Sequence, residues 1–298
     1  MANFLETLPS EADLKKWAPS DLRDWFRVII PEVGRTIIPG NLEVTERFTS
    51  HRGHHFHKIP EVFIQLHGSN RIDTPGNTIA MYPGDALIMP RGVPHRESFS
   101  TGKQGFAHLV FTLNQDRIDF HMGVSSQEDR PRTGLISGAA MRHAPQCRGY
   151  LEDIISSRNG LSPLGDTGER ALWQAACGMI HQALSMPETD SNNESPRITW
   201  VRHYIQNHIS DSNLTVSSIA SVMHCSADYL SHRFHTEVGQ RFSAYLRQAR
   251  LAFAQELLIE PELSVSEIAF ASGFQSSSYF IRVYRQHFGV SPGKARKR

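Results

Sequence analysis

The chain has 298 residues, of which 39% are hydrophobic, and its formal net charge is +1 at pH 7. This length exceeds one typical domain and predicts two, each with enough apolar side chains for a core. The three cysteines are far apart and form no Cys-x-x-Cys pair, which excludes a disulfide framework and a thiolate zinc site. No signal peptide or membrane-length apolar run is found, so we expect a cytoplasmic protein.

The near-neutral total hides an uneven distribution of charge. Residues from 196 onward contain 12 Lys and Arg against 7 Asp and Glu, whereas residues 1–195 contain 19 against 23. A basic C-terminal third is what a phosphate-binding surface needs. Residues 186–195 are polar and poor in apolar side chains, and Pro196 follows at a position typical of a helix start. We therefore expect a linker at 186–195.

Short apolar segments separated by Gly, Pro and Asn dominate the region before residue 130. They predict β-strands at 42–48, 61–66, 78–81, 86–89 and 107–112. The turns at 74–77 and 82–85 are typical of hairpin connections. Strands of this length and spacing indicate a sandwich or barrel, and we interpret residues 1–130 as a β-barrel of the jelly-roll kind.

Two groups of residues stand out in this region, His55-Phe56-His57 with Glu61 and Gly68, and Gly84 with Pro90, Gly92 and His95. They match the first and second motifs of the cupins, so residues from about 40 to 115 resemble a cupin. The family usually has a glycine where this chain has Thr49 and an asparagine where it has Phe99. The resemblance implies that His55, His57, Glu61 and His95 form the set with which cupin enzymes hold divalent iron, manganese, zinc or nickel. Alternation along a strand places both of the first two histidines on one face, and these donor types suit such ions without choosing among them.

Three interpretations of this set stay open. The residues bind a metal, or they contact a small-molecule effector and require no cofactor, or they are structural histidines. A barrel interior rich in hydrogen-bonding groups suits a neutral polyhydroxylated molecule, so we expect a carbohydrate effector, with Phe63 or Tyr82 stacking on the sugar face. The candidate effector contacts are Arg47, His55, His57, Glu61, Gln65 and His95.

A helical stretch is predicted at residues 131–185. One apolar face consists of Tyr150, Leu151, Ile154 and Ile155, and another of Leu172, Ala175, Ala176, Met179, Ile180, Ala183 and Leu184. These faces either pair two subunits or pack on the chain's own barrel, and we favour dimerisation.

The same short pattern occurs twice between residues 213 and 293. Each copy has an aliphatic residue followed by alanine, at Ile219-Ala220 and at Ile268-Ala269, then a turn, a second helix and a closing glycine. A small residue at this point lets two helices cross closely. N-caps are expected at Ser226, Ser264 and Ser276, with Glu267 completing a capping box. The pattern favours two helix-turn-helix motifs over two ordinary helical hairpins.

The two copies are joined by residues 241–259, which carry apolar side chains at helical spacing without an internal Gly or Pro. One continuous helix of about 27 Å is expected, close to the roughly 34 Å of one turn of B-DNA. The second helices of the two copies could therefore enter successive major grooves on one face of a duplex.

Residues 196–298 resemble the DNA-binding domain of the AraC/XylS family of bacterial transcription regulators. The resemblance rests on residues 230–234, on Arg250 with Ala254 and Leu257-Leu258, on residues 273–280 and on Gly289-Val290-Ser291-Pro292. Ala295 departs from the aromatic residue usual in the family. The family's base-reading positions fall on Asp228, Ser231 and His232 in the first copy and on Ser277, Ser278, Ile281 and Arg282 in the second. Arg282 either grips a guanine with two hydrogen bonds or contacts a phosphate.

The sequence thus predicts an α+β multidomain protein. Its parts are a cupin-like effector domain at 1–130, a helical dimerisation segment at 131–185, a linker at 186–195 and an all-α double helix-turn-helix domain at 196–298. We interpret it as a bacterial, nucleoid-associated homodimer that binds double-stranded DNA, contacts RNA polymerase and regulates transcription, mainly as an activator, when a small molecule binds. A metal-dependent cupin enzyme with a helical appendage and a structural DNA-binding protein without an effector are the competing classes.

Overall fold

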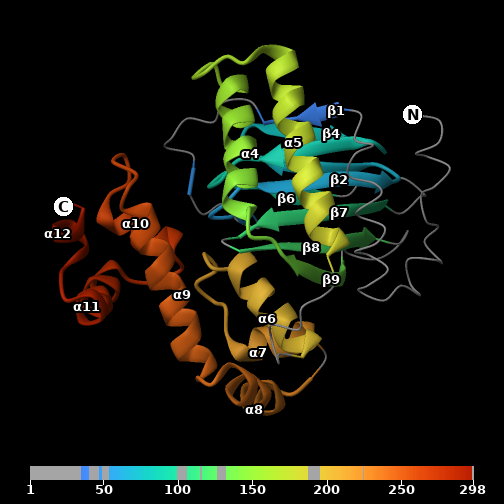
Figure 1. The fold of residues 1–298 in the computed structure, drawn as a ribbon. Coiled ribbons are helices and arrows are strands. Elements are labelled where there is room, and N and C mark those ends of the chain that lie inside the picture. Colours follow the sequence, from blue (N-terminus) through green and yellow to red (C-terminus); the bar gives the residue numbers. More distant parts are fainter. Residues whose placement is uncertain are drawn as a thin grey trace. The chain divides into compact units, whose positions relative to one another are not determined.

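The computed structural model describes residues 35–39, 47–48, 54–98, 106–114, 116–125, 132–186, 195–223 and 225–296 (Figure 1). These residues fall into two compact units. The first unit contains the described residues up to 39 and from 59 to 186, and the second contains residues 47–58 and those from 195 onward. The predicted linker lies outside the described residues except for Met186 and Ser195.

The first unit is built on two β-sheets. Its strands are β1 (Arg35–Ile37), β2 (Glu61–His67), β3 (Asn70–Thr74), β4 (Asn77–Met81), β5 (Asp85–Met89), β6 (Arg96–Ser98), β7 (Phe106–Leu113), β8 (Arg117–Ser125) and β9 (Arg132–Ala140). The larger sheet has the order β1-β5-β2-β7-β8-β9 and the smaller the order β4-β3-β6. All pairs are antiparallel except β1 with β5. The predicted β-rich region is confirmed, but the described strands form two sheets and no closed barrel.

Four of the five predicted strands coincide with β2, β4, β5 and β7 to within one residue at each end. The fifth, at 42–48, lies outside the described residues except for Arg47 and Phe48, which form a turn. The turn at 74–77 joins the paired strands β3 and β4 as expected. The turn at 82–85 was wrongly expected to close a hairpin. It carries the chain from β4 in the small sheet to β5 in the large one, and the Asp85 N–H donates to the Tyr82 carbonyl at 2.9 Å.

Alternation along β2 separates two hydrophobic layers. Val62, Ile64 and Leu66 belong to the core that the large sheet shares with helices α4 (Ala144–Arg158) and α5 (Gly165–Ser185). Phe63 belongs to a second core, between the two sheets, with Ile72, Ile79, Met81, Leu87, Met89, Val93 and Val110. Side chains on the same face of β2 as Phe63 therefore point into the space between the sheets.

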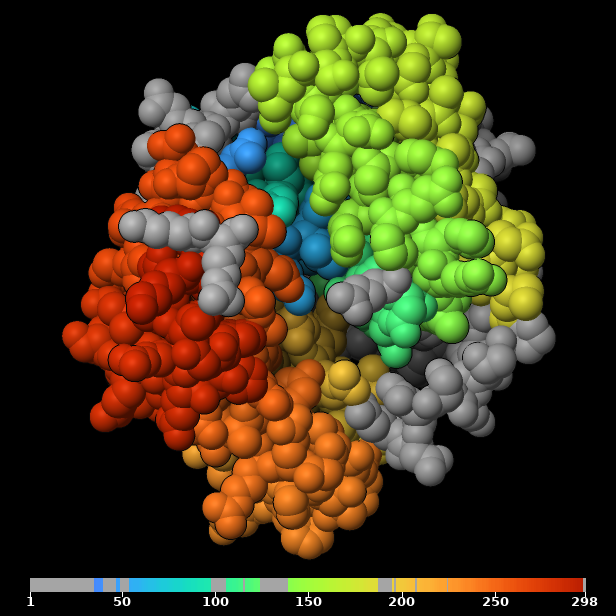
Figure 2. Space-filling model, turned by 60° about the vertical axis from the view of Figure 1, so that its left-hand side comes forward, coloured from blue at the N-terminus to red at the C-terminus, as the bar shows by residue number. Residues whose placement is uncertain are grey.

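Helices α4 and α5 pair with each other and cover one face of the large sheet, and they form the yellow-green outer layer of Figure 2. Most of the apolar stripe assigned to dimerisation packs inward, because Leu151, Ile154, Ala176, Ile180 and Leu184 are buried against their own sheet. The predicted helical stretch also began too early, since residues 132–140 form β9. Because β9 extends the sheet along β8, this segment adds to the sheet and not to the helical layer.

The three cysteines are all free thiols. Cys147 and Cys177 are buried in the first unit, and burial raises the pKa of each to about 12. Cys225 is half-buried and lies in the second unit, immediately before a helix cap.

The second unit is helical. Its helices are α6 (Pro196–Asn207), α7 (Val216–Val222), α8 (Ala227–Val238), α9 (Phe242–Leu257), α10 (Val265–Ala271), α11 (Ser277–Phe288) and α12 (Pro292–Ala295). Helices α7 and α8 form the first helix-turn-helix and α10 and α11 the second, and the single helix α9 joins them as predicted (Figure 1). No helix among the described residues is both long and apolar enough to cross a membrane.

Local capping chemistry explains where these helices begin and end. Ser226 and Ser276 accept from the backbone N–H groups of Tyr229 and Tyr279, as expected for the N-caps of α8 and α11. Ser264 and Glu267 form the predicted capping box of α10. Thr215 and Ser218 form a second capping box, at α7, which was not predicted. Both α8 and α11 stop at a left-handed glycine, Gly239 and Gly289, each with φ of 77°.

Arg250 fastens the two helix-turn-helix motifs to each other. Its side chain extends from α9 and donates to the backbone carbonyls of Ile209 at 3.3 Å and Asp211 at 2.6 Å, in the segment that leads into α7. Gly273, at the end of α10, packs against the same guanidinium. The positively charged group thus donates charge-assisted hydrogen bonds to two backbone carbonyls at this junction, of which that of Asp211 also accepts from the Leu214 N–H.

Phe48 and Phe56, from the described residues 47–48 and 54–58, pack into the core of the second unit. Phe48 and Phe56 are buried, with ring centroids 6.4 Å and 6.2 Å from that of Phe253 on α9. Lys58 pairs with Glu256 at 3.4 Å. This segment carries the first two histidines of the predicted cupin motif, which therefore belong to the second unit.

Candidate nucleic-acid interface and buried polar cluster

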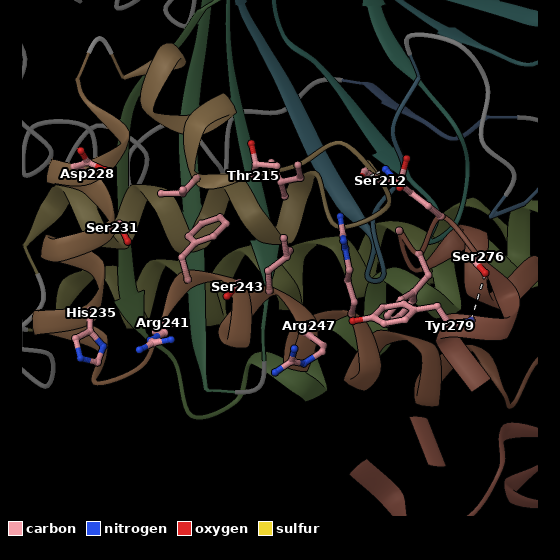
Figure 3. A pocket seen from close by; sticks show the side chains of 18 of the residues that line it. Ser212, Thr215, Asp228, Ser231, His235, Arg241, Ser243, Arg247, Ser276 and Tyr279 are labelled. Carbon is pink, nitrogen blue, oxygen red and sulfur yellow. Dashed lines mark hydrogen bonds between the residues drawn. The ribbon is translucent and has the colours of Figure 1, made fainter. Parts of the chain in front are cut away.

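A groove of about 900 Å³ runs between the two helix-turn-helix motifs of the second unit. Its wall on one side comes from α8, its floor from the first half of α9, and its other side from the start of α11 (Figure 3). Asp228, Ser231 and His232, the three residues predicted to read DNA from the first motif, line this groove. The structure therefore brings one predicted set of reading residues together on one exposed surface.

Asp228 has a local structural role in addition to any contact with a base. It lies in the first turn of α8, where a carboxylate is stabilised by the partial positive charge of the helix N-terminus. A negative group at this point repels phosphate, so Asp228 can face DNA only where a cytosine amine, rather than the backbone, is within reach.

The second predicted set lies on α11. Ser278, Ile281 and Arg282 are exposed and Ser277 is half-buried. The Arg282 guanidinium lies 5.3 Å from the centroid of the Tyr279 ring, a cation–π arrangement. Ile281 is 39% exposed, which is unusual for an isoleucine on a folded helix and leaves it available for apolar contact with a thymine methyl.

In the first unit, two members of the predicted cupin set lie side by side between the sheets. Glu61 and His95 are 2% and 0% exposed, and Nε2 of His95 lies 3.3 Å from Oε2 of Glu61. His95 Nδ1 is 2.9 Å from the Val93 carbonyl, so Nδ1 carries the proton and Nε2 faces the carboxylate. Of the two aromatic residues expected to stack on a sugar, Phe63 is buried beside His95, whereas Tyr82 is 57% exposed.

A second buried polar group, centred on His108, was not predicted. Asn70 Oδ1 accepts from the Arg71 N–H at 2.8 Å, so the Asn70 Nδ2 donates to His108 Nδ1 at 3.2 Å. His108 Nε2 then carries the proton and lies 3.2 Å from Oε1 of Glu97. The period-2 pattern of β7 places His108 on the same face as Val110, and this alternation could have found it.

Gln65, a predicted effector contact, lies on the same inner face of β2 as Phe63. Its Nε2 donates to the carbonyls of His67 at 2.7 Å and Gly68 at 3.2 Å, which fixes the orientation of the amide. Its Oε1 is fully buried and accepts no hydrogen bond within the part of the chain that the structure describes. A buried acceptor of this kind is costly unless a donor reaches it.

Replacing Gly123 with alanine should displace His108. A Cβ at Gly123 would lie 2.2 Å from His108 Nε2, so the imidazole must leave the space between Asn70 and Glu97. We expect Gly123→Ala to destabilise the first unit by about 1–3 kcal/mol, measured by denaturant unfolding. Gly149→Ala is the matched control, because it lies on α4 with no atom within 4 Å of the added methyl and should be neutral or stabilising. Equal stability of both variants would show that His108 does not depend on this contact.

The remaining predicted effector residues, Arg47, His55 and His57, belong to the segment that packs with the second unit. The ring centroids of His55 and His57 are 5.0 Å apart. His55 also stacks on His208 of the second unit, with centroids 5.9 Å apart, and burial lowers the pKa of His208 to about 4. The His208 ring is therefore neutral at pH 7 and presents an uncharged face to His55.

The second unit contains two capped helix-turn-helix motifs that one helix joins, and the second helix of each motif, α8 or α11, has an exposed face. This arrangement defines a DNA-binding domain of the double helix-turn-helix class. The family model described as a helix-turn-helix domain matches residues 219–298. The match is to the helix-turn-helix domain alone, and the chain is similar to transcriptional regulators that carry such a domain.

Several curated proteins are similar to this chain over larger parts of its length. The uncharacterized HTH-type transcriptional regulator YpdC of Escherichia coli K12 is 30% identical over 179 residues, which cover 58% of this chain and 61% of YpdC. The uncharacterized regulator YijO of the same organism is 26% identical over 80% of this chain and 81% of its own length. The arabinose operon regulatory protein of E. coli K12 is 22% identical over 78% of each chain.

Among solved structures, the C-terminal domain of AraT, a response regulator from Geobacillus stearothermophilus, is 37% identical and covers 35% of this chain and 87% of its own, with a TM-score of 0.34. The three named curated relatives are described as transcriptional or operon regulators. These similarities favour a regulator over the alternative of a metal-dependent cupin enzyme.

Proposed function

We propose that this protein is a sequence-specific regulator of transcription that binds double-stranded DNA and responds to a small molecule. The observation that carries the proposal is the pair of exposed second helices, α8 and α11, held at fixed positions by α9 and Arg250. Two rigidly joined reading helices suit successive major grooves of one duplex. The base-reading residues proposed are Asp228, Ser231 and His232 on α8 and Ser277, Ser278, Ile281 and Arg282 on α11.

The effector proposed is a neutral, hydroxyl-bearing molecule, most simply a sugar, bound between the two sheets of a cupin-like first unit. The inner face there combines an aromatic ring, Phe63, with buried hydrogen-bonding groups at Glu61, Gln65 and His95. The unsatisfied Oε1 of Gln65 is an acceptor for a ligand hydroxyl. One relative is named as a regulator of an arabinose operon, which agrees with a carbohydrate signal.

A divalent metal is a second proposal for the same residues. The 3.3 Å separation of the Glu61 and His95 donor atoms, both buried, fits two ligands of one ion. Such an ion would hold and polarise an effector oxygen. Glu61 and His95 would act as its ligands, and Gln65 would remain free to accept from the effector.

We further propose that the regulator acts as a cytoplasmic homodimer and activates transcription through contact with RNA polymerase. Four residues of the predicted dimerisation stripe are not fully buried: Tyr150, Leu172 and Met179 are partly buried and Ala175 is exposed. Two subunits would engage repeated half-sites and gain affinity from linked binding. Sedimentation of the purified full chain, with and without DNA, tests the dimer.

The function is tested by fluorescence anisotropy with the full chain, using the DNA upstream of its own gene and a scrambled duplex at physiological salt. We expect strong preference for the natural fragment, and a shift of that preference by one member of a sugar panel or by an added divalent metal. Equal weak binding to both duplexes would overturn the regulator proposal. If the chain prefers the natural fragment but no sugar or metal changes that preference, the effector proposal alone would be overturned.

Arg282 is expected to read a base and not only a phosphate. Because bidentate pairing with guanine needs the planar guanidinium, Arg282→Lys should lose discrimination between natural and scrambled DNA by about 1–3 kcal/mol, roughly 5- to 150-fold, although it keeps the charge. The comparison is made by measuring Kd for both duplexes with wild type, Arg282→Lys and Arg282→Ala. A lysine variant that discriminates as well as wild type would assign Arg282 to the backbone.

A further inference from the structure

The floor of the groove in the second unit carries positive side chains that no reading position accounts for. Arg241 precedes the first turn of α9 and Arg247 lies in its second turn, and both are exposed. Neither guanidinium group makes a hydrogen bond or an ion pair within the described residues. Figure 3 places their guanidinium groups in one row with His235, between Asp228 and Ser231 at one end and Ser276 and Tyr279 at the other.

The charges in this groove are arranged for an anion. Arg250 also lines it, but its Nε and Nη2 donate to the carbonyls of Ile209 and Asp211. Asp228 is the one carboxylate among the lining residues. The hydroxyls of Ser231 and Ser243 are exposed beside the arginines and can donate to further oxygens. A surface with two unpaired guanidinium groups and hydroxyl donors favours a ligand with several negatively charged oxygens.

The position of the groove indicates where those oxygens lie on DNA. Helix α9 has 16 residues, about 24 Å at 1.5 Å per residue, and it separates α8 from α11. When two reading helices enter successive major grooves, the duplex between them presents a minor groove edged by the phosphates of both strands. Side chains on the floor of α9 therefore meet backbone and not base edges.

We propose that Arg241 and Arg247 form a sequence-independent phosphate clamp between the two reading helices. The inference rests on the proposed DNA-binding function and adds to it a division of labour. Helices α8 and α11 read bases, whereas α9 holds the sugar–phosphate backbone that bridges the two reading sites. Contacts to phosphate fix the register and orientation of a protein on the duplex without carrying sequence information.

The test measures Kd of the full chain for its natural upstream DNA and for the scrambled duplex over a range of salt concentrations. We expect Arg247→Ala to weaken binding to both duplexes by the same factor. The slope of log K against log salt should fall by about 0.9 for each phosphate contact removed. Arg241→Ala should behave in the same way, and the double variant should lose about twice as much slope. Arg247→Lys should recover most of it, because a phosphate contact needs charge more than planarity.

The control is Arg142→Ala, an exposed arginine before α4 in the first unit that removes the same charge far along the chain from the helix-turn-helix motifs. It should leave the slope unchanged. A slope unchanged in the Arg241 and Arg247 variants, or a loss confined to the natural duplex, would overturn the clamp. If the wild-type chain shows no preference for the natural duplex, the proposed regulator function fails, and the salt slope still decides the clamp. Circular dichroism of each variant confirms that the helices are intact.

Discussion

Gly273→Ala should strongly destabilise the second unit and abolish DNA binding. Gly273 has a φ of +82°, a left-handed conformation that side chains other than glycine rarely adopt. A Cβ at this position would also lie 2.3 Å from the Ile209 carbonyl oxygen and 2.6 Å from Arg250 Nε. Strained backbone of this kind costs about 1–3 kcal/mol, and the displaced Arg250 contacts add to it, so we expect a loss of about 3 kcal/mol or more. Urea unfolding of the full chain measures it.

The matched control is Gly289→Ala. Gly289 has nearly the same backbone conformation, with φ of +77°, but no atom lies within 4 Å of the position of an added methyl. Gly289→Ala should lower the free energy of unfolding by only about 1 kcal/mol, because only the left-handed backbone is strained. Equal losses in the two variants would show that the contact with Arg250 and the Ile209 carbonyl adds nothing.

Phe56→Ala should loosen the DNA-binding unit although Phe56 lies in the predicted cupin motif. The ring is 1% exposed and packs against Phe253 and Phe48. Truncating a buried phenylalanine to alanine typically costs about 3–5 kcal/mol, because contacts are lost and a cavity is left behind. Hydrogen exchange with mass spectrometry should show faster exchange in peptides from α6 and α9 and unchanged exchange in α4 and α5.

Phe270→Ala controls for loss of an aromatic ring in the same unit, since Phe270 is 49% exposed on α10 and should cost little. If instead Phe56→Ala raised exchange in α4 and α5 and spared α9, the ring would contribute to the first unit and not to the second.

The helices of the second unit could be predicted closely because their signals are local. Ser264 with Glu267, and Ser276, identify helix starts from side chains only three residues from the N–H groups they bind. The continuous helix expected at 241–259 is observed at 242–257, because no residue within it interrupts the i, i+3, i+4 pattern. The Thr215 box was missed because its partner is Ser218, whereas the usual signature has Glu or Gln.

The first unit was predicted less well because its pairings are not local. The sequence of the Pro-Gly turn at 82–85 fits either a hairpin between β4 and β5 or a crossing from one sheet to the other. Only the strands with which β5 pairs distinguish these two connections. The apolar stripe of α4 and α5 likewise predicts a buried face, but it does not indicate whether a second subunit or the chain's own sheet covers that face.

The candidate site was found in part from motif and in part by position. Glu61 and His95 are 34 positions apart in the sequence and are neighbours in the structure. Their proximity could be predicted because the resemblance to a cupin carries long-range information that periodicity lacks. His108 belongs to no motif and was overlooked. Similarly, Arg241 and Arg247 are ordinary surface charges in the sequence, and only the packing of α9 between two helix-turn-helix motifs places them on the floor of a groove.

Because the three thiols are unequally buried, a thiol reagent should modify Cys225 selectively. A thiol with a pKa of about 12, as for Cys147 and Cys177, is ionised to about one part in ten thousand at pH 8, and both are shielded from reagents. Cys225 alone is partly exposed, and it immediately precedes Ser226, which caps the reading helix α8. A maleimide fluorophore should therefore attach at that turn without any cysteine being removed. A fluorophore attached there would lie beside the first reading helix and could report DNA binding at that helix.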